Sequence, residues 1–119
     1  MAKQSMPKAL KDKWIADLRN PKRKQCTTSL SDGNGGFCCL GRLMVVADGR
    51  IRKSRSLDGE WGLPTIRFAR AHGITPYLSD CTNFLLTIEG KQKAASQHND
   101  EGRTFAEIAD AIERDVEGV

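Results

Sequence analysis

The sequence predicts an α+β fold: a single small domain in which three or four helices pack on a short antiparallel β-sheet or hairpin. Three observations support this fold class. Apolar residues recur at helical spacing in several segments, a glycine-rich turn separates two short apolar runs, and the chain has 119 residues. A chain of this length buries one core, so residues 1–119 are expected to form one domain with frayed carboxyl-terminal residues 117–119.

Two helices are predicted in the first two thirds of the chain. In the first, Leu10, Trp14 and Leu18 recur at i, i+4 and i+8. This helix ends before Pro21, because the residue that precedes a proline avoids the helical region. The second covers residues 64–72, with a proline at its first position and a glycine just after its end.

The carboxyl-terminal helix has the clearest pattern. Its apolar residues at helical spacing are Phe105, Ile108, Ala109, Ile112 and Val116. Thr104 and Glu107 form a T-x-x-E capping box, which provides hydrogen-bond partners for two backbone amides at the start of the helix.

The middle of the chain is predicted to contain the β-structure. Residues 25–30 and 37–39 flank a turn rich in glycine and asparagine, so they are expected to form the two strands of a hairpin. Residues 40–47 have apolar side chains at i, i+3, i+4 and i+7, which favours a short helix, although two adjacent valines favour a strand. Residues 84–88 are predicted to form a strand, whereas residues 50–62 and 91–102 are predicted to be polar loops.

The net charge of +4 is unevenly distributed along the chain. Residues 1–75 carry 15 basic and 6 acidic side chains, whereas residues 76–119 carry 4 basic and 9 acidic ones. A uniformly basic protein is therefore excluded, and the difference in charge between the two parts of the chain has to be explained.

Membrane and secreted classes are disfavoured. The longest apolar runs, residues 37–40 and 43–47, are far shorter than the roughly 18 residues that a membrane span needs. The amino end is charged where a signal peptide needs an apolar stretch. We therefore expect a cytoplasmic protein without a membrane partner, in which the four cysteines are reduced.

Metal and nucleotide motifs are incomplete. Residues 36–43 approach the phosphate-binding pattern G-x-x-x-x-G-K-[ST], but Arg42 replaces the lysine and a leucine replaces the residue that holds magnesium. Cys38 and Cys39 are adjacent, whereas zinc-binding cysteines usually lie two to four residues apart. No metal ion or cofactor is expected.

A thiol enzyme is an alternative that the sequence leaves open. It would need a cysteine close in space to a base such as His72 or His98. Buried, inert cysteines are the commoner use of this residue type, so we expect the protein not to be an enzyme.

Clusters of basic residues are the remaining functional signal. They lie near the end of the first helix, beside the predicted hairpin, in the loop 50–62 and on the helix 64–72. The candidate anion-binding residues are Arg19, Lys22, Arg23, Lys24, Arg42, Arg50, Arg52, Lys53, Arg55, Arg67 and Arg70. If they converge, they would attract a nucleic acid, a nucleotide-like ligand or an acidic protein. The alternative is a solvated basic surface that pairs with the acidic carboxyl-terminal helix.

Several blocks of the sequence resemble a family of small bacteriophage and prophage proteins. The blocks are Phe37-Cys38-Cys39-Leu40-Gly41, the helix start at Leu63-Pro64, and Thr104-Phe105-Ala106-Glu107-Ile108-Ala109-Asp110. Many relatives have an apolar residue in place of Arg42 and a further cysteine in place of Met44. The resemblance implies a virus-encoded accessory protein in the host bacterial cytoplasm. It implies no catalytic residues, because the family has no assigned activity.

Together these observations predict a phage-encoded accessory protein that acts by binding through a basic face. The expected partner is a host protein complex, a nucleic acid or a nucleotide, and the expected effect is to inhibit or modulate a host nucleic-acid-handling or defence complex. The alternatives are sequestration of a nucleotide-like small molecule and an oligomeric structural or interaction module that does not contact nucleic acid. Assembly into a homo-oligomer is compatible with each of these functions.

Overall fold

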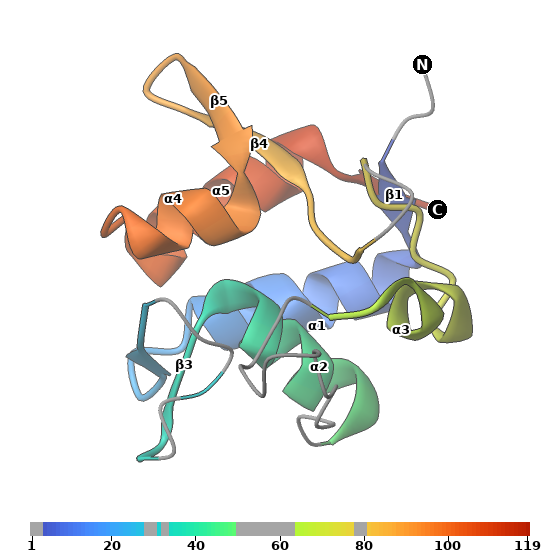
Figure 1. Cartoon of the computed structure of the whole chain (residues 1–119), viewed down its shortest axis with the longest axis horizontal. Helices are drawn as coiled ribbons and strands as arrows, with labels where there is room; N and C mark the ends of the chain where they lie inside the picture. Colours follow the sequence, from blue (N-terminus) through green and yellow to red (C-terminus); the bar gives the residue numbers. More distant parts are fainter. Residues whose placement is uncertain (1–3, 28–30, 32–33, 50–63, 78–80) are drawn as a thin grey trace.

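The computed structural model describes residues 4–27, 31, 34–49, 64–77 and 81–119. Within these ranges the chain forms five helices and three two-stranded sheets (Figure 1), which confirms the predicted α+β class. In chain order the elements are β1 (Ser5–Met6), α1 (Lys8–Leu18), β2 (Lys24–Gln25), β3 (Gly36–Phe37), α2 (Cys39–Asp48), α3 (Ile66–Ala71), β4 (Leu85–Ile88), β5 (Lys91–Ala94), α4 (Ala95–Asp100), α5 (Phe105–Asp115) and β6 (Glu117–Gly118). None of the helices in the described ranges is long and apolar enough to cross a membrane.

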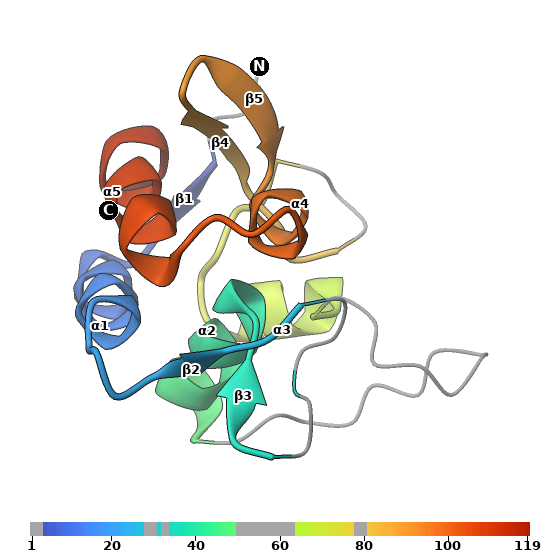
Figure 2. The same ribbon diagram turned by 90° about the vertical axis from the view of Figure 1, so that its left-hand side faces the viewer.

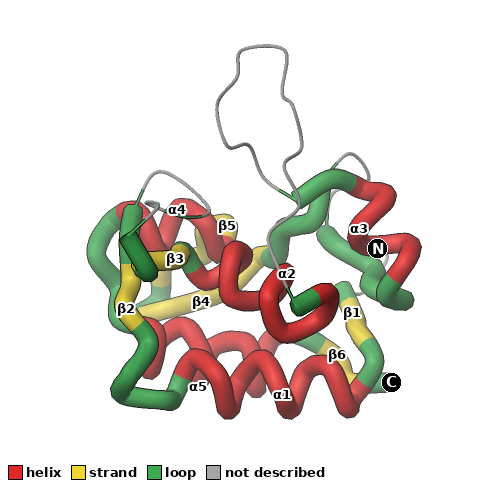
Figure 3. Tube along the Cα trace, turned by 90° about the horizontal axis from the view of Figure 1, so that it is seen from below, coloured by secondary structure: helices red, strands yellow, loops and turns green. Residues whose placement is uncertain are grey.

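The core lies between two layers of helices. In Figure 2, α1 and α5 lie on one side of the molecule, and α2 and α4 lie on the other. Figure 3 shows α1 and α5 side by side. Trp14 of α1 is fully buried between the layers, where its Nε1 donates to the Cys39 carbonyl at 2.9 Å. Its ring centroid lies 5.4 Å from that of Phe84, so α1, α2 and the start of β4 share one core.

The predicted helices begin and end close to the expected residues. The capping box of α5 is present, with Thr104 accepting from the Glu107 amide. The helix expected at residues 40–47 is α2, which ends at Gly49 in the left-handed region with φ of 78°. The helix expected to start at Pro64 starts two residues later, because Thr65 is its N-cap and accepts from the amide of Phe68.

For the hairpin predicted from residues 25–30 and 37–39, residues 28–30 lie outside the described residues, and the antiparallel pairing is wrong for the part of the first strand that is described. β2 and β3 pair in parallel, with Lys24 opposite Gly36 and Gln25 opposite Phe37. The antiparallel neighbour of Phe37 is Ser31, through one isolated bridge. Phe37 therefore lies between Ser31 and β2. The longer pairing is with β2, which is further from Phe37 in sequence.

The prediction of a loop for residues 91–102 is also wrong, because most of these residues form β5 and α4. Glu89 and Gly90, with φ of 51° and 75°, form a tight turn that pairs β4 with β5 antiparallel. In α4 the buried positions include His98 and Asn99. Because the buried face of α4 is largely polar, its sequence lacks the apolar periodicity that predicts a helix.

Residues 117–119, expected to be frayed, are paired. β6 lies parallel to β1, with Ser5 opposite Glu117 and Met6 opposite Gly118. The Val119 amide donates to the Met6 carbonyl at 2.9 Å, and the Lys8 amide donates to the Val119 carbonyl at 3.0 Å. The two ends of the described chain therefore meet at the start of α1.

Candidate functional site

Those basic residues predicted to bind an anion that the structure describes do not form one surface. Arg50, Arg52, Lys53 and Arg55 lie outside the described residues. The other seven lie in the segment between α1 and β2, on β2 itself, on α2 and on α3. α3 lies at the opposite end of the molecule from β2 (Figure 1), so the exposed Arg67 and Arg70 are separated from the residues that follow α1.

Arg42 belongs to the core, which corrects its assignment as a binding residue. Its guanidinium donates two hydrogen bonds to the carboxylate of Asp17, at 2.6 Å and 2.7 Å. Less than a tenth of either side chain is exposed. The guanidinium also lies 5.0 Å from the centroid of the Phe37 ring. Arg42 therefore joins α2 to α1 and is not available to a ligand.

Two further arginines are paired with acidic residues of the same chain. Arg19 contacts Asp110 at 2.8 Å and Glu113 at 2.7 Å, both on α5. These hydrogen bonds, first that to Glu113, raise the pKa of Arg19. Arg23 contacts Asp17 at 3.0 Å. Of the two alternatives for the basic residues, Arg19 therefore follows the second, because it pairs with the acidic carboxyl-terminal helix.

The segment between α1 and β2 presents the remaining basic side chains, and we call Lys22, Arg23 and Lys24 the basic turn. Lys22 and Lys24 are exposed and form no ion pair within the described ranges. Asn20 shapes the turn: its side-chain oxygen accepts from the Lys22 amide at 3.0 Å, and its carbonyl accepts from the Arg23 amide at 3.0 Å.

A buried amide network holds β2 against the rest of the molecule. The side-chain oxygen of Asn99, which is fully buried, accepts from Gln25 at 2.9 Å and from the Cys39 amide at 3.2 Å. The Asn99 side-chain nitrogen donates to the Cys26 carbonyl at 2.8 Å. Asn99 therefore connects α4 to β2 and to the first residue of α2, and it fixes where the basic turn lies.

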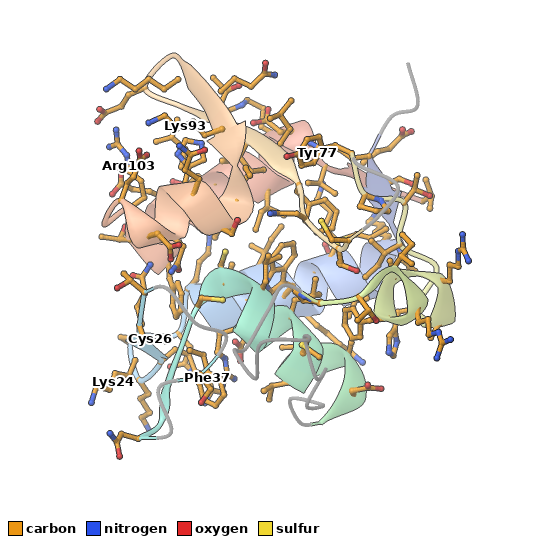
Figure 4. The ribbon with its side chains drawn as sticks, in the orientation of Figure 1. Lys24, Cys26, Phe37, Tyr77, Lys93 and Arg103 are labelled. Carbon is orange, nitrogen blue, oxygen red and sulfur yellow. The ribbon has the colours of Figure 1, made fainter. Side chains whose placement is uncertain are left out.

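Gln25 also connects the basic turn to a second cationic region. Its Nε2 donates to the Arg103 carbonyl at 2.7 Å. Figure 4 shows Lys24 at the lower left of the molecule, and Arg103 and Lys93 at the upper left.

Beside Arg103 is a cavity of about 380 Å³, which we call the α4–α5 pocket. Its lining side chains include Lys91, Lys93, His98, Glu101, Arg103 and Glu107. They come from β5, from α4, from the turn after α4 and from α5. No sequence pattern predicts this site, because residues 91–102 have the composition of a polar loop.

Ion pairs arrange the cations around the α4–α5 pocket. Lys93 contacts both carboxylate oxygens of Glu101 at 2.8 Å, which lowers the pKa of Glu101. Arg103 contacts Glu89 at 3.0 Å and Glu107 at 3.2 Å. Its hydrogen bond lowers the pKa of Glu89, and the same bond raises the pKa of Arg103. Lys91 forms no ion pair within the described part of the chain.

A larger hollow of about 860 Å³ runs along β4, but its backbone edge is already occupied. The Gln4 side chain donates to the Leu85 carbonyl at 2.6 Å and accepts from the Leu85 amide at 2.7 Å. Asp115 accepts from the Thr87 amide at 2.8 Å, and Arg114 donates to the Thr87 carbonyl. These side chains take the place of a neighbouring strand, which is a common protection of a sheet edge.

Cys38 and Cys39 are not arranged for nucleophilic catalysis. Burial raises the pKa of the Cys38 thiol to about 11 and that of Cys39 well above its usual value. His98 Nε2 is bonded to the Leu86 carbonyl at 2.7 Å, and His72 Nε2 to Asp48 at 3.1 Å. Among the described residues, no group of three or more His, Cys, Asp or Glu side chains is placed to hold a metal ion.

The comparison with protein families covers nearly the whole chain. A model described as a domain of unknown function (DUF8296) matches residues 6–116. The chain belongs to this family. The matched range of the DUF8296 domain includes the basic turn, Asn99 and the α4–α5 pocket. No curated protein and no solved structure shows significant similarity to the chain.

Proposed function

We propose that this DUF8296 domain is a phage-encoded accessory protein that binds an anionic partner in the cytoplasm of the host bacterium, without catalysis. The partner is a nucleic acid or a host complex that handles one, and binding inhibits or modulates that complex. The viral setting is supported by the resemblance of the F-C-C-L-G and T-F-A-E-I-A-D blocks to phage proteins. The binding role is supported by the end of the molecule that carries the basic turn and the α4–α5 pocket.

One observation carries the proposal. The hydrogen bond from Gln25 to the Arg103 carbonyl brings together two cationic segments that lie far apart in sequence. Lys22 and Lys24 come from one segment, and Lys91 comes from the other. None of the three ammonium groups forms an ion pair within the described residues, so they can contact phosphate groups without first breaking one.

The expected binding is electrostatic and sensitive to salt. Each phosphate that a lysine neutralises releases counterions, so the logarithm of the affinity falls linearly with the logarithm of the salt concentration. Tight sequence recognition is not expected from this surface, because lysines that contact phosphates carry no base information.

The test is a fluorescence anisotropy titration with labelled single-stranded DNA and RNA at several salt concentrations. The double substitution Lys22→Ala/Lys24→Ala is expected to weaken binding and to reduce the slope of the salt dependence by about 1–2. Arg67→Ala/Arg70→Ala removes the same charge from α3, at the other end of the molecule, and is expected to leave binding nearly unchanged.

Two results would count against the proposal. If both double variants weaken binding equally, only net charge matters and the basic turn has no special role. If the wild-type protein binds neither polymer at low salt, and captures no host complex from nuclease-treated lysate that salt releases, the anionic partner is excluded.

A further inference from the structure

His98 is almost completely buried, yet it lines the α4–α5 pocket. Only 2% of the residue is exposed. Its Nε2 lies 2.7 Å from the Leu86 carbonyl, and because a carbonyl oxygen can only accept, Nε2 carries a proton. Within the described residues, no fully buried side-chain nitrogen or oxygen lacks a partner. Nδ1 has no partner, so it reaches the surface, and His98 lines this pocket.

The cations around the pocket keep hydrogen-bond donors that their ion pairs do not use. An ammonium group has three N–H donors and a guanidinium has five. Lys93 is engaged with the two oxygens of Glu101, and Arg103 with one oxygen each of Glu89 and Glu107. The exposed Lys91 retains all three donors, because it forms no ion pair in the described ranges.

The pocket also contains acceptors, which a site for a fully ionised anion would not need. The carboxylates of Glu101 and Glu107 line it together with His98. When the imidazole is neutral with its proton on Nε2, Nδ1 is an acceptor. A fitting ligand therefore carries negative charge for the lysines and the arginine, and at least one hydrogen atom to donate.

We propose that the α4–α5 pocket binds a phosphate group that still carries a proton, as inorganic phosphate or a phosphate monoester, and rejects sulfate. A phosphate monoester keeps one proton below its second pKa of about 6. Sulfate has the same shape but no proton near neutral pH, so it would leave the Nδ1 of His98 facing a negatively charged oxygen.

The size and position of the pocket agree with this ligand class. Its volume of about 380 Å³ is at the lower end of the range for small-molecule sites. The basic turn lies alongside, through the bond from Gln25 to the Arg103 carbonyl. This inference rests on the proposed function, since it names the terminal phosphate of a nucleotide or nucleic acid as the group that enters the pocket.

The test is calorimetry at pH 7.5, where inorganic phosphate still carries a proton, with inorganic phosphate and with sulfate at matched ionic strength, together with nitrogen NMR of the His98 ring. We expect phosphate to bind at least about tenfold more tightly than sulfate, because sulfate leaves an acceptor unpaired. We also expect phosphate, but not sulfate, to shift the Nδ1 resonance of His98.

Two matched variants complete the experiment. Lys91→Ala is expected to weaken phosphate binding about tenfold or more, while Lys13→Ala, which removes another exposed lysine without an ion pair, is expected to leave it unchanged. Equal affinity for phosphate and sulfate, or no phosphate binding at millimolar concentration, overturns the inference. The Lys22→Ala/Lys24→Ala variant separates the two proposals, because it is expected to lose affinity for nucleic acid and keep affinity for phosphate.

Discussion

The position of Cys38 in the fold changes the chemistry of its thiol. Its sulfur accepts a hydrogen bond from the Gly41 amide at 3.3 Å and so serves as the N-cap of α2. Burial outweighs this contact and raises the pKa of the thiol from 9.0 to about 11. The folded protein therefore binds this proton more tightly than the unfolded chain does.

The stability that Cys38 contributes should be lost at high pH. Because the pKa is higher in the folded state, the contribution is complete below pH 9 and disappears as the pH rises through about 11. Chemical denaturation at several pH values is expected to show a fall in the free energy of unfolding over this interval. A Cys38→Ala variant should show a smaller fall. An unchanged fall in that variant would contradict the assignment.

The residues that build the candidate site differ from those that sequence patterns can reveal. Arg42 belongs to a basic cluster in sequence, but only the fold shows that Asp17 lies opposite it. Gln25 and Asn99 are uncharged and follow no motif, yet they determine where the basic turn lies. Lys22 and Lys24 could be predicted, because exposed lysines after a helix need no tertiary contact to be identified.

At the scale of elements, α4 depends on polar rather than apolar packing. Its fully buried Asn99 connects it to β2 and to α2 through three hydrogen bonds. Ala95 and His98 complete the buried face of this six-residue helix. A helix this short has little stability of its own, so its place in the fold depends on these contacts.

Replacing Asn99 should therefore affect both stability and binding. Asn99→Ala leaves the Cys39 amide and the Cys26 carbonyl without their partner, and we expect a loss of at least about 2 kcal/mol in the free energy of unfolding. Nucleic-acid binding should weaken as well, because β2 and the basic turn lose their anchor. Urea denaturation and the anisotropy assay measure these effects.

A control substitution distinguishes the network from general damage to α4. Ser96→Ala changes a half-buried residue of the same helix, whose hydroxyl accepts from Asn83. It should leave binding intact. If Ser96→Ala weakens binding as much as Asn99→Ala does, the special role assigned to the Asn99 network is wrong.

The elements that sequence predicted well are those with a local signal. α1, α2 and α5 have apolar stripes, and α5 also has a capping box. The hairpin between β2 and β3 was wrong because strand direction there depends on which distant segment Phe37 pairs with. β5 was missed because its residues are largely polar and exposed, with no alternation.

For the whole molecule, the contrast between the basic and acidic parts of the sequence is only partly cancelled by the fold. Arg19 meets two carboxylates of α5, which neutralises charge across the contact between α1 and α5. The basic turn keeps two unpaired lysines at one end, and α3 presents two exposed arginines at the other. The described surface therefore has two separate basic regions.

The paired ends of the chain lead to a further prediction at this scale. Deleting residues 117–119 removes the pairing of β6 with β1, including the backbone hydrogen bonds that join Gln4, Met6 and Lys8 to the last residues. We expect the free energy of unfolding to fall by at least about 3 kcal/mol, near 1 kcal/mol for each of these three bonds, as measured by urea denaturation. Val119→Ala keeps all three bonds and should cost much less. No loss on deletion would show that the pairing is not stabilising.

The parallel pairing of β1 with β6 also has a consequence for the order of folding during translation. β1 is made first, but the strand beside it is complete only when residue 118 has been added. At the usual pace of 5–20 residues per second, β1 waits roughly 5–20 seconds for its partner. Until then β1 lacks this neighbour, although Ser5 can already pair with Thr75, so the sheet of β1 and β6 closes late in the folding of the domain.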